Sequence, residues 1–233
     1  GDNSSLKFIR ILGSKIIKIS SGLLNNYYLT EKLAKLNMPI IISTGLAYKK
    51  EIKKSLKIIE KFNNSQIGIL VCTSIYPTKD SQVKIDTIRS FIKLYKNKFI
   101  GYSDHSEDNL SSYIAAGNGA AIIEKHITMK RKNFGDHKFA LEAKDFKKFI
   151  HNIRRIGILN LKKNLPLKEE ISLRKKIHRY IVARRNIAKG EKFTLENIAL
   201  KRTFDKSKGL STDKFKKILE KKSKSKIKKN FKI

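Results

Sequence analysis

The 233-residue sequence has no tryptophan, three prolines, two methionines and one cysteine, Cys72. A single cysteine cannot form a disulfide within the chain or supply a zinc site built from several thiolates, which is typical of a reducing compartment. No apolar run approaches the roughly 18 residues of a membrane-spanning helix. Residues 1–5 read GDNSS, without the basic and then apolar segments of a signal peptide. We therefore expect a cytoplasmic protein that does not interact with membranes.

Acidic residues are also scarce, since 20 Asp and Glu stand against 53 Lys and Arg, for a net charge of +33. Such a charge suggests nucleic acid as a partner. However, the lysines are spread along the whole chain and arginine, the usual reader of bases and phosphates, is the minority basic residue. We find no zinc-finger spacing and no Gly-rich RNA-binding signature. We interpret the charge as a solvated lysine surface with no specific nucleic acid partner, and keep a basic nucleic-acid-binding protein as an alternative.

From its start to about residue 156 the sequence repeats one unit: a short β-branched run, a polar tip and a segment with helical periodicity. The predicted strands are 16–20, 39–43, 68–73, 99–103 and 120–126. The apolar residues expected on the buried helix faces are Leu29, Leu33 and Leu36; Ile52, Leu56 and Ile59; Ile85, Ile88 and Ile92; Leu110 and Ile114; and Phe146, Ile150 and Ile153. Strands that are apolar without alternation predict a parallel sheet covered on both faces.

Polar residues gather at the C-terminal tips of these strands, where (β/α)₈ barrels place their catalytic groups. An open, doubly wound sheet is the competing architecture. It would bind its ligand at one switch point, and we find no Gly-rich fingerprint after the first strand. The sequence therefore favours a barrel-type arrangement for residues 1–156.

Two further segments follow the repeat. Residues 157–175 are rich in lysine, contain Pro166 and predict a linker with one short helix. Residues 176–233 have shorter runs, with a turn around Gly190, and predict a small β-rich second domain. At under about 60 residues this domain has room for only a thin core, so we expect it to pack against something.

Two adjacent predicted strands each end at a histidine, His105 in the segment GYSDH and His126 in the segment EKH. If these strands are neighbours in a parallel sheet, the imidazoles can converge on one divalent ion and leave coordination positions open for water or substrate. Single histidines at strand ends are also common as hydrogen-bonded structural residues. The spacing alone leaves both interpretations open.

Lys18 lies within the apolar run of the first predicted strand, close to Ser21, where a lysine is costly unless it meets an anion. Other hydroxyls at the strand tips are Ser43, Thr73, Ser74 and Ser103. Together they predict a cradle for phosphate and carboxylate groups, although serines at strand tips are also ordinary loop residues. Asp136, after the last strand, is a candidate to hold a sugar hydroxyl or act as a base, or it is a plain turn aspartate.

Segments along nearly the whole chain resemble, in order and with matching intervals, the motifs of the sialic acid synthase (N-acetylneuraminate synthase) family. In the first domain these are 18–22 (KISSG) with 25–27 (NNY), 41–45 (IISTG), 72–77 (CTSIYP), 101–105 (GYSDH), 124–128 (EKHIT) and 135–142 (GDHKFALE). In the second domain, 181–184 (IVAR), 187–191 (IAKGE) and 200–202 (LKR) resemble the antifreeze-like (SAF) domain of that family. Each motif is weak alone, whereas the ordered set is specific.

The resemblance implies the C-terminal five βα units of a TIM (β/α)₈ barrel, strands four to eight, followed by a SAF domain. It implies condensation of phosphoenolpyruvate with N-acetylmannosamine or a related amino sugar, which yields a nine-carbon 2-keto sugar acid and phosphate.

The roles that the resemblance implies are as follows: Lys18, Ser21 and Ser103 for phosphoenolpyruvate; His105 and His126 for Mn²⁺ or Mg²⁺; Tyr76 and Asp136 for the sugar site; Ser74 for substrate binding; and Arg202 for the sugar bound by the other subunit of a homodimer. In that homodimer the SAF domain would cap the partner's active site. Lys18, His105, His126 and Asp136 are the catalytic candidates.

The sequence departs from the family pattern in three ways. Leu23 stands where the family usually has an acidic residue, and Ser74 stands where asparagine is common. The resemblance also begins at the helix before the fourth strand, and about 156 residues of βα repeat fall below the roughly 200 of a closed barrel. We expect a synthase portion whose activity depends on strands one to three, which a separate chain would supply if the enzyme is split. The alternative is a non-catalytic remnant that binds sugar or acts as a scaffold.

Overall fold

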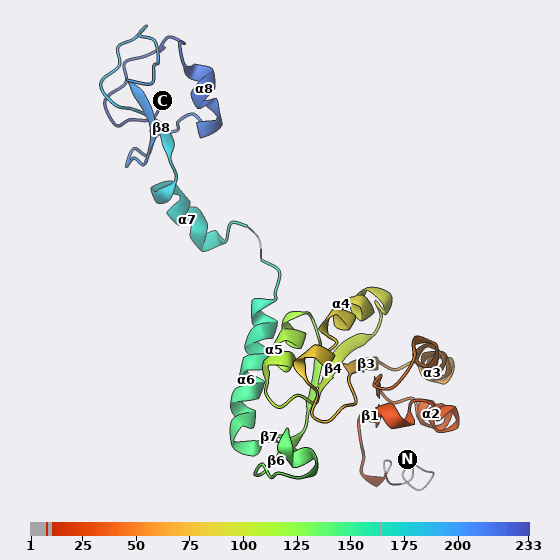
Figure 1. The fold of residues 1–233 in the computed structure, drawn as a ribbon. Helices are drawn as coiled ribbons and strands as arrows, with labels where there is room; N and C mark the ends of the chain where they lie inside the picture. Colours follow the sequence, from red (N-terminus) through yellow and green to blue (C-terminus); the bar gives the residue numbers. More distant parts are fainter. Residues whose placement is uncertain (1–7, 9–10, 164) are drawn as a thin grey trace. The chain divides into compact units, whose positions relative to one another are not determined.

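The computed structural model describes Phe8 and residues 11–163 and 165–233 (Figure 1). The chain divides into two compact units, Gly1–Leu161 and Lys162–Ile233. Each has a hydrophobic core of its own. Among the residues so described, no helix combines the length and the apolar character that crossing a bilayer requires.

The first unit is built on a five-stranded parallel sheet whose strands are adjacent in chain order. The strands are β1 (Ile17–Ile19), β2 (Ile40–Ser43), β3 (Ile67–Cys72), β4 (Phe99–Asp104) and β5 (Ile122–Lys125). A doubly wound sheet would reverse its order at a switch point, so this order confirms the barrel-type α/β arrangement. The helices that join and follow the strands are α2 (Tyr27–Ala34), α3 (Lys49–Phe62), α4 (Ile85–Leu94), α5 (Leu110–Gly117) and α6 (Ala143–Leu159).

Short elements shape the loops after the strands. They are the 3₁₀ turns η1 (Ser21–Leu23), η2 (Asp80–Gln82) and η3 (Gly135–Lys138), and the small parallel pair β6 (Ile127–Thr128) and β7 (Leu141–Glu142). Most of these segments follow the carboxyl end of a strand, where they surround the polar tips of the sheet.

The strand residues of the main core all lie on one face of the sheet, against the helices. They are Ile17, Ile19, Ile40, Ile42, Ile67, Ile69, Val71, Ile100 and Tyr102. On the opposite face Leu70, Cys72 and Ser103 are buried as well, whereas Lys18 of β1 is exposed. The predicted covering of both faces therefore holds for β3 and β4 but not for β1. Right-handed crossovers between successive strands place every helix on the same side. The opposite face carries Lys18, Leu70, Cys72, Ser103 and Glu124 in the observed register.

Helix faces follow the predicted periodicity in α3, where Ile52, Leu56 and Ile59 are buried. In α5 the prediction is wrong, because Leu110 and Ile114 are 57% and 42% exposed.

The buried face of α5 is formed instead by Ser111, Ser112, Ala115 and Ala116. Small residues let this helix lie close to β4, and Ser112 donates a hydrogen bond to Asp104. Ile92, at 37% exposed, also departs from the predicted buried face of α4.

The second unit contains α7 (Lys168–Ile177), the antiparallel strands β8 (Tyr180–Ala183) and β9 (Ile198–Lys201), the turn η4 (Thr212–Lys214) and α8 (Phe215–Ile218). Its buried core consists of Ile181, Ala183, Ile187, Phe193, Ile198 and Ile218. Later segments return to this core through bridges such as Ile187 with Ile227 and Val182 with Lys232.

Candidate active site

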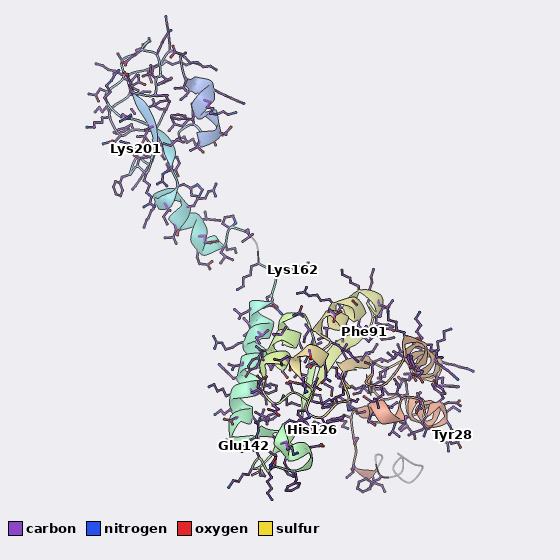
Figure 2. The ribbon with its side chains drawn as sticks, in the orientation of Figure 1. Tyr28, Phe91, His126, Glu142, Lys162 and Lys201 are labelled. Atoms are coloured by element: carbon purple, nitrogen blue, oxygen red, sulfur yellow. The ribbon has the colours of Figure 1, made fainter. Side chains whose placement is uncertain are left out.

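A hollow of about 380 Å³ opens at the carboxyl ends of the sheet strands. It is lined by Lys18, Ser20, Ser21, Gly22, Ser43, Leu46, Cys72, Ser74, Tyr76, Ser103, His105, Glu124 and His126. Most of the site residues proposed from the sequence line this hollow, because each follows the end of a parallel strand or lies on the sheet face opposite the helices. Figure 2 labels His126, which directly follows β5.

Three of the proposed residues lie outside the hollow. Thr73 does not line it, and its hydroxyl donates to the carbonyl of Gln82. Asp136 is beside the hollow in η3, and its Oδ2 atom is 3.4 Å from His126 Nδ1. Arg202 is exposed and belongs to the second unit, directly after β9.

Lys18 meets an anion, although it is exposed and not buried as its place in the apolar run suggested. Its Nζ atom lies 3.3 Å from Glu124 Oε2, and both side chains are about one third exposed, at 36% and 35%. Ser103 Oγ donates to the other carboxylate oxygen, Glu124 Oε1, at 2.7 Å. Glu124 therefore joins two groups that were both proposed to hold phosphoenolpyruvate.

Hydroxyl and thiol groups meet where β1 and β3 end. Cys72 Sγ lies 3.3 Å from Ser21 Oγ and 3.6 Å from Ser74 Oγ. In the part of the chain that the structure describes, Ser43 Oγ is buried without a hydrogen-bond partner. A buried hydroxyl that lacks a partner costs free energy, so Ser43 points to a ligand that accepts its hydrogen bond.

His105 is held in a defined orientation. Its Nδ1 atom lies 2.8 Å from the carbonyl oxygen of Thr73, so Nδ1–H donates to that carbonyl and leaves the lone pair on Nε2. Burial lowers the pKa of His105 below its ordinary value, against a smaller raising effect of the Thr73 carbonyl. This imidazole is thus favoured in its neutral form, the form that binds metals.

The two imidazoles suit a shared divalent cation. Their ring centroids are 5.3 Å apart, close to the separation of about 5 Å expected for two imidazoles on one metal with bonds of about 2.1 Å. The Thr73 carbonyl also orients His105 in the way that outer groups orient metal-binding histidines. Within the described ranges, no group of three or more His, Cys, Asp and Glu side chains is placed to hold a metal. The remaining ligands would be water and substrate, as in an open catalytic site.

Aromatic rings pack around the histidines. The Tyr76 ring centroid is 4.3 Å from that of His105, and Phe139 lies 5.0 Å from His126 and 6.4 Å from His105. Tyr76 is half exposed, whereas Phe139 is 1% exposed. Burial raises the pKa of Tyr76, which keeps its hydroxyl protonated.

Sequence reasoning gave no role to Glu124, Phe139 or Cys72, although their motifs were noted. Glu124 lies in β5, two residues before His126, which directly follows that strand. This spacing is a usable signal because it places both side chains on the same face. The Phe139 contact depends on the loop after β6 folding back on the site, which no local pattern indicates. The ring proximity of Phe139 to both histidines emerges only in three dimensions.

Leu23 does not line the hollow. It lies in η1 and packs, partly buried, against the hydrophobic core of the first unit. The residue that replaces the family's usual acidic group is therefore part of the packing beneath the site.

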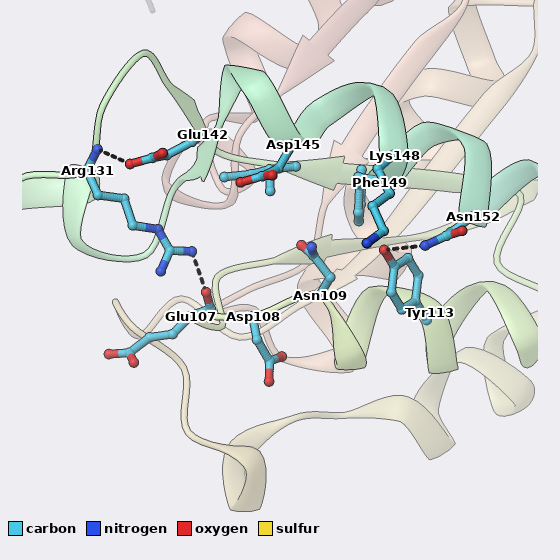
Figure 3. Close-up of a pocket in the computed structure, with 11 residues that line it drawn as sticks. Glu107, Asp108, Asn109, Tyr113, Arg131, Glu142, Asp145, Lys148, Phe149 and Asn152 are labelled. Atoms are coloured by element: carbon cyan, nitrogen blue, oxygen red, sulfur yellow. Dashed lines mark hydrogen bonds between the residues drawn. The ribbon is translucent and has the colours of Figure 1, made fainter.

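A second hollow, of about 700 Å³, lies between α6 and the segment from β4 to α5 (Figure 3). Arg131 spans one end of it, where its guanidinium donates to the Glu107 carbonyl and its backbone N–H donates to Glu142. None of the site residues proposed from the sequence lines this larger hollow. The candidate site is therefore the smaller hollow, on which Lys18, Ser103 and the two histidines converge.

Comparisons with known proteins agree with this fold. The sequence matches the NeuB family over residues 2–163 and the SAF domain over residues 178–230. It is 35% identical to an N,N'-diacetyllegionaminic acid synthase of Campylobacter jejuni, over 86% of this chain and 61% of that protein. It is 29% identical to the human N-acetylneuraminate-9-phosphate synthase, over 86% of this chain and 56% of that protein.

Solved structures extend the likeness. The N-acetylneuraminic acid synthetase of Leptospira borgpetersenii aligns with a TM-score of 0.69 and 32% identity, over 76% of this chain and 63% of that chain. The spore coat polysaccharide biosynthesis protein SpsE of Bacillus subtilis aligns with a TM-score of 0.65 and 27% identity, over 100% of this chain and 70% of that chain. The chain spans 56% to 61% of the length of the two synthases matched by sequence.

Proposed function

This chain belongs to the NeuB family and carries a SAF domain, and we propose on that premise that it performs the condensation step of a sialic acid synthase. The proposed reaction joins phosphoenolpyruvate to N-acetylmannosamine or a related amino sugar, consumes one water, forms a nine-carbon 2-keto sugar acid and releases phosphate. The observation that carries the proposal is the convergence of Lys18, several hydroxyls and two imidazoles on one hollow.

In this proposal the Lys18 side of the hollow binds phosphoenolpyruvate. Lys18, Ser21 and Ser103 would hold its anionic groups, and the unpartnered hydroxyl of Ser43 would donate a further hydrogen bond. Charge-assisted hydrogen bonds of this kind are stronger than neutral ones. They would also stabilise the negative charge that grows on the phosphate as it leaves.

The histidine side of the hollow would receive the sugar. Ser74, Tyr76 and Asp136 would contact its polar groups, and Asp136 reaches this side through its 3.4 Å approach to His126. Mn²⁺ or Mg²⁺ bound by His105 and His126 would polarise the sugar aldehyde for attack. The protein's own part is to fix both imidazoles, which the Thr73 carbonyl and Phe139 support.

A homodimer would complete the proposed site. Arg202 is exposed at the end of β9, where a guanidinium is free to reach a ligand of another subunit. In this arrangement the SAF domain caps the active site of the partner, and Arg202 of the partner subunit contacts the sugar.

The test measures phosphate release from phosphoenolpyruvate in the presence of N-acetylmannosamine and Mn²⁺. It uses this chain alone and this chain joined to three upstream βα units taken from a relative, because the matched synthases are longer. We expect turnover in the completed form and its loss in His105→Gln. A completed form that folds and releases no phosphate with N-acetylated mannosamine or its diamino relatives would contradict the proposal.

A second candidate is a non-catalytic module that binds sugar or acts as a scaffold. The observation that favours it is Leu23, which packs against the core at the position usually held by an acidic residue. In that case the completed form would bind the amino sugar in calorimetry but show no turnover, including with Leu23→Glu.

A further inference from the structure

The carboxyl ends of β4 and β5 are joined by an ion pair that lies behind the histidines. Lys125 Nζ is 3.0 Å from Asp104 Oδ2, and the two side chains are 2% and 0% exposed. Asp104 and Lys125 are direct register partners across the two strands. Each immediately precedes one of the histidines, His105 and His126.

Hydrogen bonds saturate this pair. The ammonium of Lys125 has three N–H groups, which donate to Asp104 Oδ2 and to the carbonyl oxygens of Ser106 and Asp108. Asp104 Oδ1 accepts from the backbone N–H and the hydroxyl of Ser106, and Oδ2 also accepts from Ser112. A buried pair with every donor and acceptor used has one permitted geometry, because any displacement leaves a buried polar group without a partner.

The same contacts hold the loop that follows His105. The buried Lys125 ammonium donates to the carbonyl oxygens of Ser106 and Asp108. Arg131 donates to the carbonyl oxygen of the residue between them, Glu107, at 2.7 Å (Figure 3). Three successive carbonyl groups are thus held by cations from the β5 side of the sheet. The backbone on both sides of His105 is fixed relative to β5.

Strand alternation connects this pair to the site. Successive side chains of a strand point to opposite faces, so Asp104 and Lys125 face the helices while the next residues face the hollow. Ser112 of α5 contacts Asp104 on the helix side, and both histidines line the hollow on the other. The position of each imidazole therefore depends on how the pair sets the two strand ends.

We propose that the Asp104–Lys125 ion pair is a positioning element that sets the distance and angle between the His105 and His126 imidazoles. The metal-binding consequence rests on the proposed function, whereas the imidazole geometry does not. Four donors surround the Asp104 carboxylate, namely the Lys125 ammonium, the Ser112 hydroxyl, and the hydroxyl and backbone N–H of Ser106. This is the environment that a paired carboxylate needs when it is buried.

The test compares three forms of the full chain with the parent: Lys125→Met, the double variant Asp104→Asn with Lys125→Met, and Ile59→Ala. Lys125→Met leaves a buried carboxylate unpaired and is the least stable, whereas the double variant removes both charges and regains stability. Ile59 is 0% exposed on α3 and serves as the control that loses stability by cavity formation away from β4 and β5.

Two readouts separate positioning from stability. The first is the nuclear Overhauser cross-peak between the His105 and His126 ring protons, whose ring centroids are 5.3 Å apart, in a chain with five labelled histidines. The second is the Kd for Mn²⁺ measured by calorimetry. We expect the double variant to lose the cross-peak and to bind Mn²⁺ about tenfold more weakly or worse, despite its recovered Tm. Ile59→Ala should keep the parent values at a lowered Tm.

The proposal is overturned if the double variant keeps both the cross-peak and the Kd of the parent, since the pair would then serve folding alone. If the parent itself binds no Mn²⁺, the metal part of the proposed function fails. The cross-peak comparison still decides the positioning role in that case, so the two failures are distinguishable.

Discussion

Gly45 lies so close to Ser74 that a Cβ atom at position 45 would stand 2.1 Å from Ser74 Oγ. The same atom would be 2.5 Å from Cys72 Sγ and 2.8 Å from Ser21 Oγ. These are far inside van der Waals contact. The three polar groups that form one wall of the hollow therefore meet only because residue 45 has no side chain.

The first prediction is that Gly45→Ala disrupts this wall. The added methyl group must displace Ser74, Cys72 and Ser21 together, and overpacking of this kind costs about 1–3 kcal/mol. We expect a lower free energy of unfolding in urea and a weaker affinity for inorganic phosphate in calorimetry.

The matched control is Gly157→Ala in α6, where, among the described residues, the added Cβ meets no atom within 4 Å apart from its chain neighbours and the nearby backbone of its own helix. Replacing a helical glycine with alanine in open space should stabilise the chain by about 0.5–1 kcal/mol. Equal stabilities of Gly45→Ala and the parent would show that the wall moves apart without cost.

The second prediction concerns the charge of Glu124. Glu124→Gln keeps an oxygen that accepts the hydrogen bond from Ser103 but removes the charge that pairs with Lys18. An anionic ligand no longer competes with a carboxylate for Lys18, so the affinity for inorganic phosphate should rise. Because the pair is about one third exposed, its strength is at most about 1 kcal/mol, which corresponds to a rise of up to about fivefold.

Lys18→Met is the companion variant for this measurement. It removes the cation and should lower the phosphate affinity below that of the parent, which assigns the effect to Lys18. A weaker affinity in Glu124→Gln would contradict the prediction and indicate that the carboxylate itself orients the phosphate-binding groups.

The five-stranded parallel sheet and the convergence of the histidines could be predicted because both follow from local patterns. β-Branched runs mark the strands, and parallel strands bring their carboxyl ends to the same edge. His105 and His126 each directly follow a strand, so their proximity needed only the strand order. Ile52, Leu56 and Ile59 likewise follow helical periodicity onto the buried face of α3.

The buried face of α5 and the pairing of Glu124 with Lys18 could not be predicted, because both depend on contacts between segments that are distant in the sequence. The buried face of α5 is set by Ser112, which binds Asp104 of β4, and this contact turns Leu110 and Ile114 outward against their hydrophobicity. The pairing of Glu124 with Lys18 spans the sheet from β5 to β1. The side chains of Lys18 and Glu124 come within reach only because the five strands curve towards each other. This curvature is a property of the whole sheet and cannot be predicted from any single segment.

The third prediction is that the free energy of unfolding of the second unit falls as the pH falls in the acid range, a dependence called the acid limb below. Asp205 accepts hydrogen bonds from the backbone N–H of Lys232 and from the hydroxyl and backbone N–H of Ser207. The Lys232 bond is the leading cause that lowers the pKa of Asp205 from 3.8 to about 2. Since the folded pKa is depressed, the stabilisation is complete above pH 3.8 and is lost as the pH falls from 3.8 towards 2.

Hydrogen exchange of the second unit in the full chain would measure this limb. Asp205→Asn should flatten it and should lower protection at neutral pH by about 1 kcal/mol, a modest value because the carboxylate is partly exposed to solvent. The exposed Glu196, changed to Gln, is the control and should leave the limb in place. An unchanged limb in Asp205→Asn would assign it to another carboxylate.

The fourth prediction is that Leu23→Glu lowers stability without increasing turnover. Leu23 packs against the core and does not line the hollow, so a carboxylate there loses apolar contacts and must either be buried or bend away. Burial of a polar group without a partner costs about 1–3 kcal/mol, whereas Leu23→Met, which keeps the volume, should cost less than about 1.5 kcal/mol. Urea unfolding and phosphate release, measured on both variants in the form completed with upstream βα units, would check this. A gain in phosphate release from Leu23→Glu would mean that the η1 turn can rotate this side chain into the site.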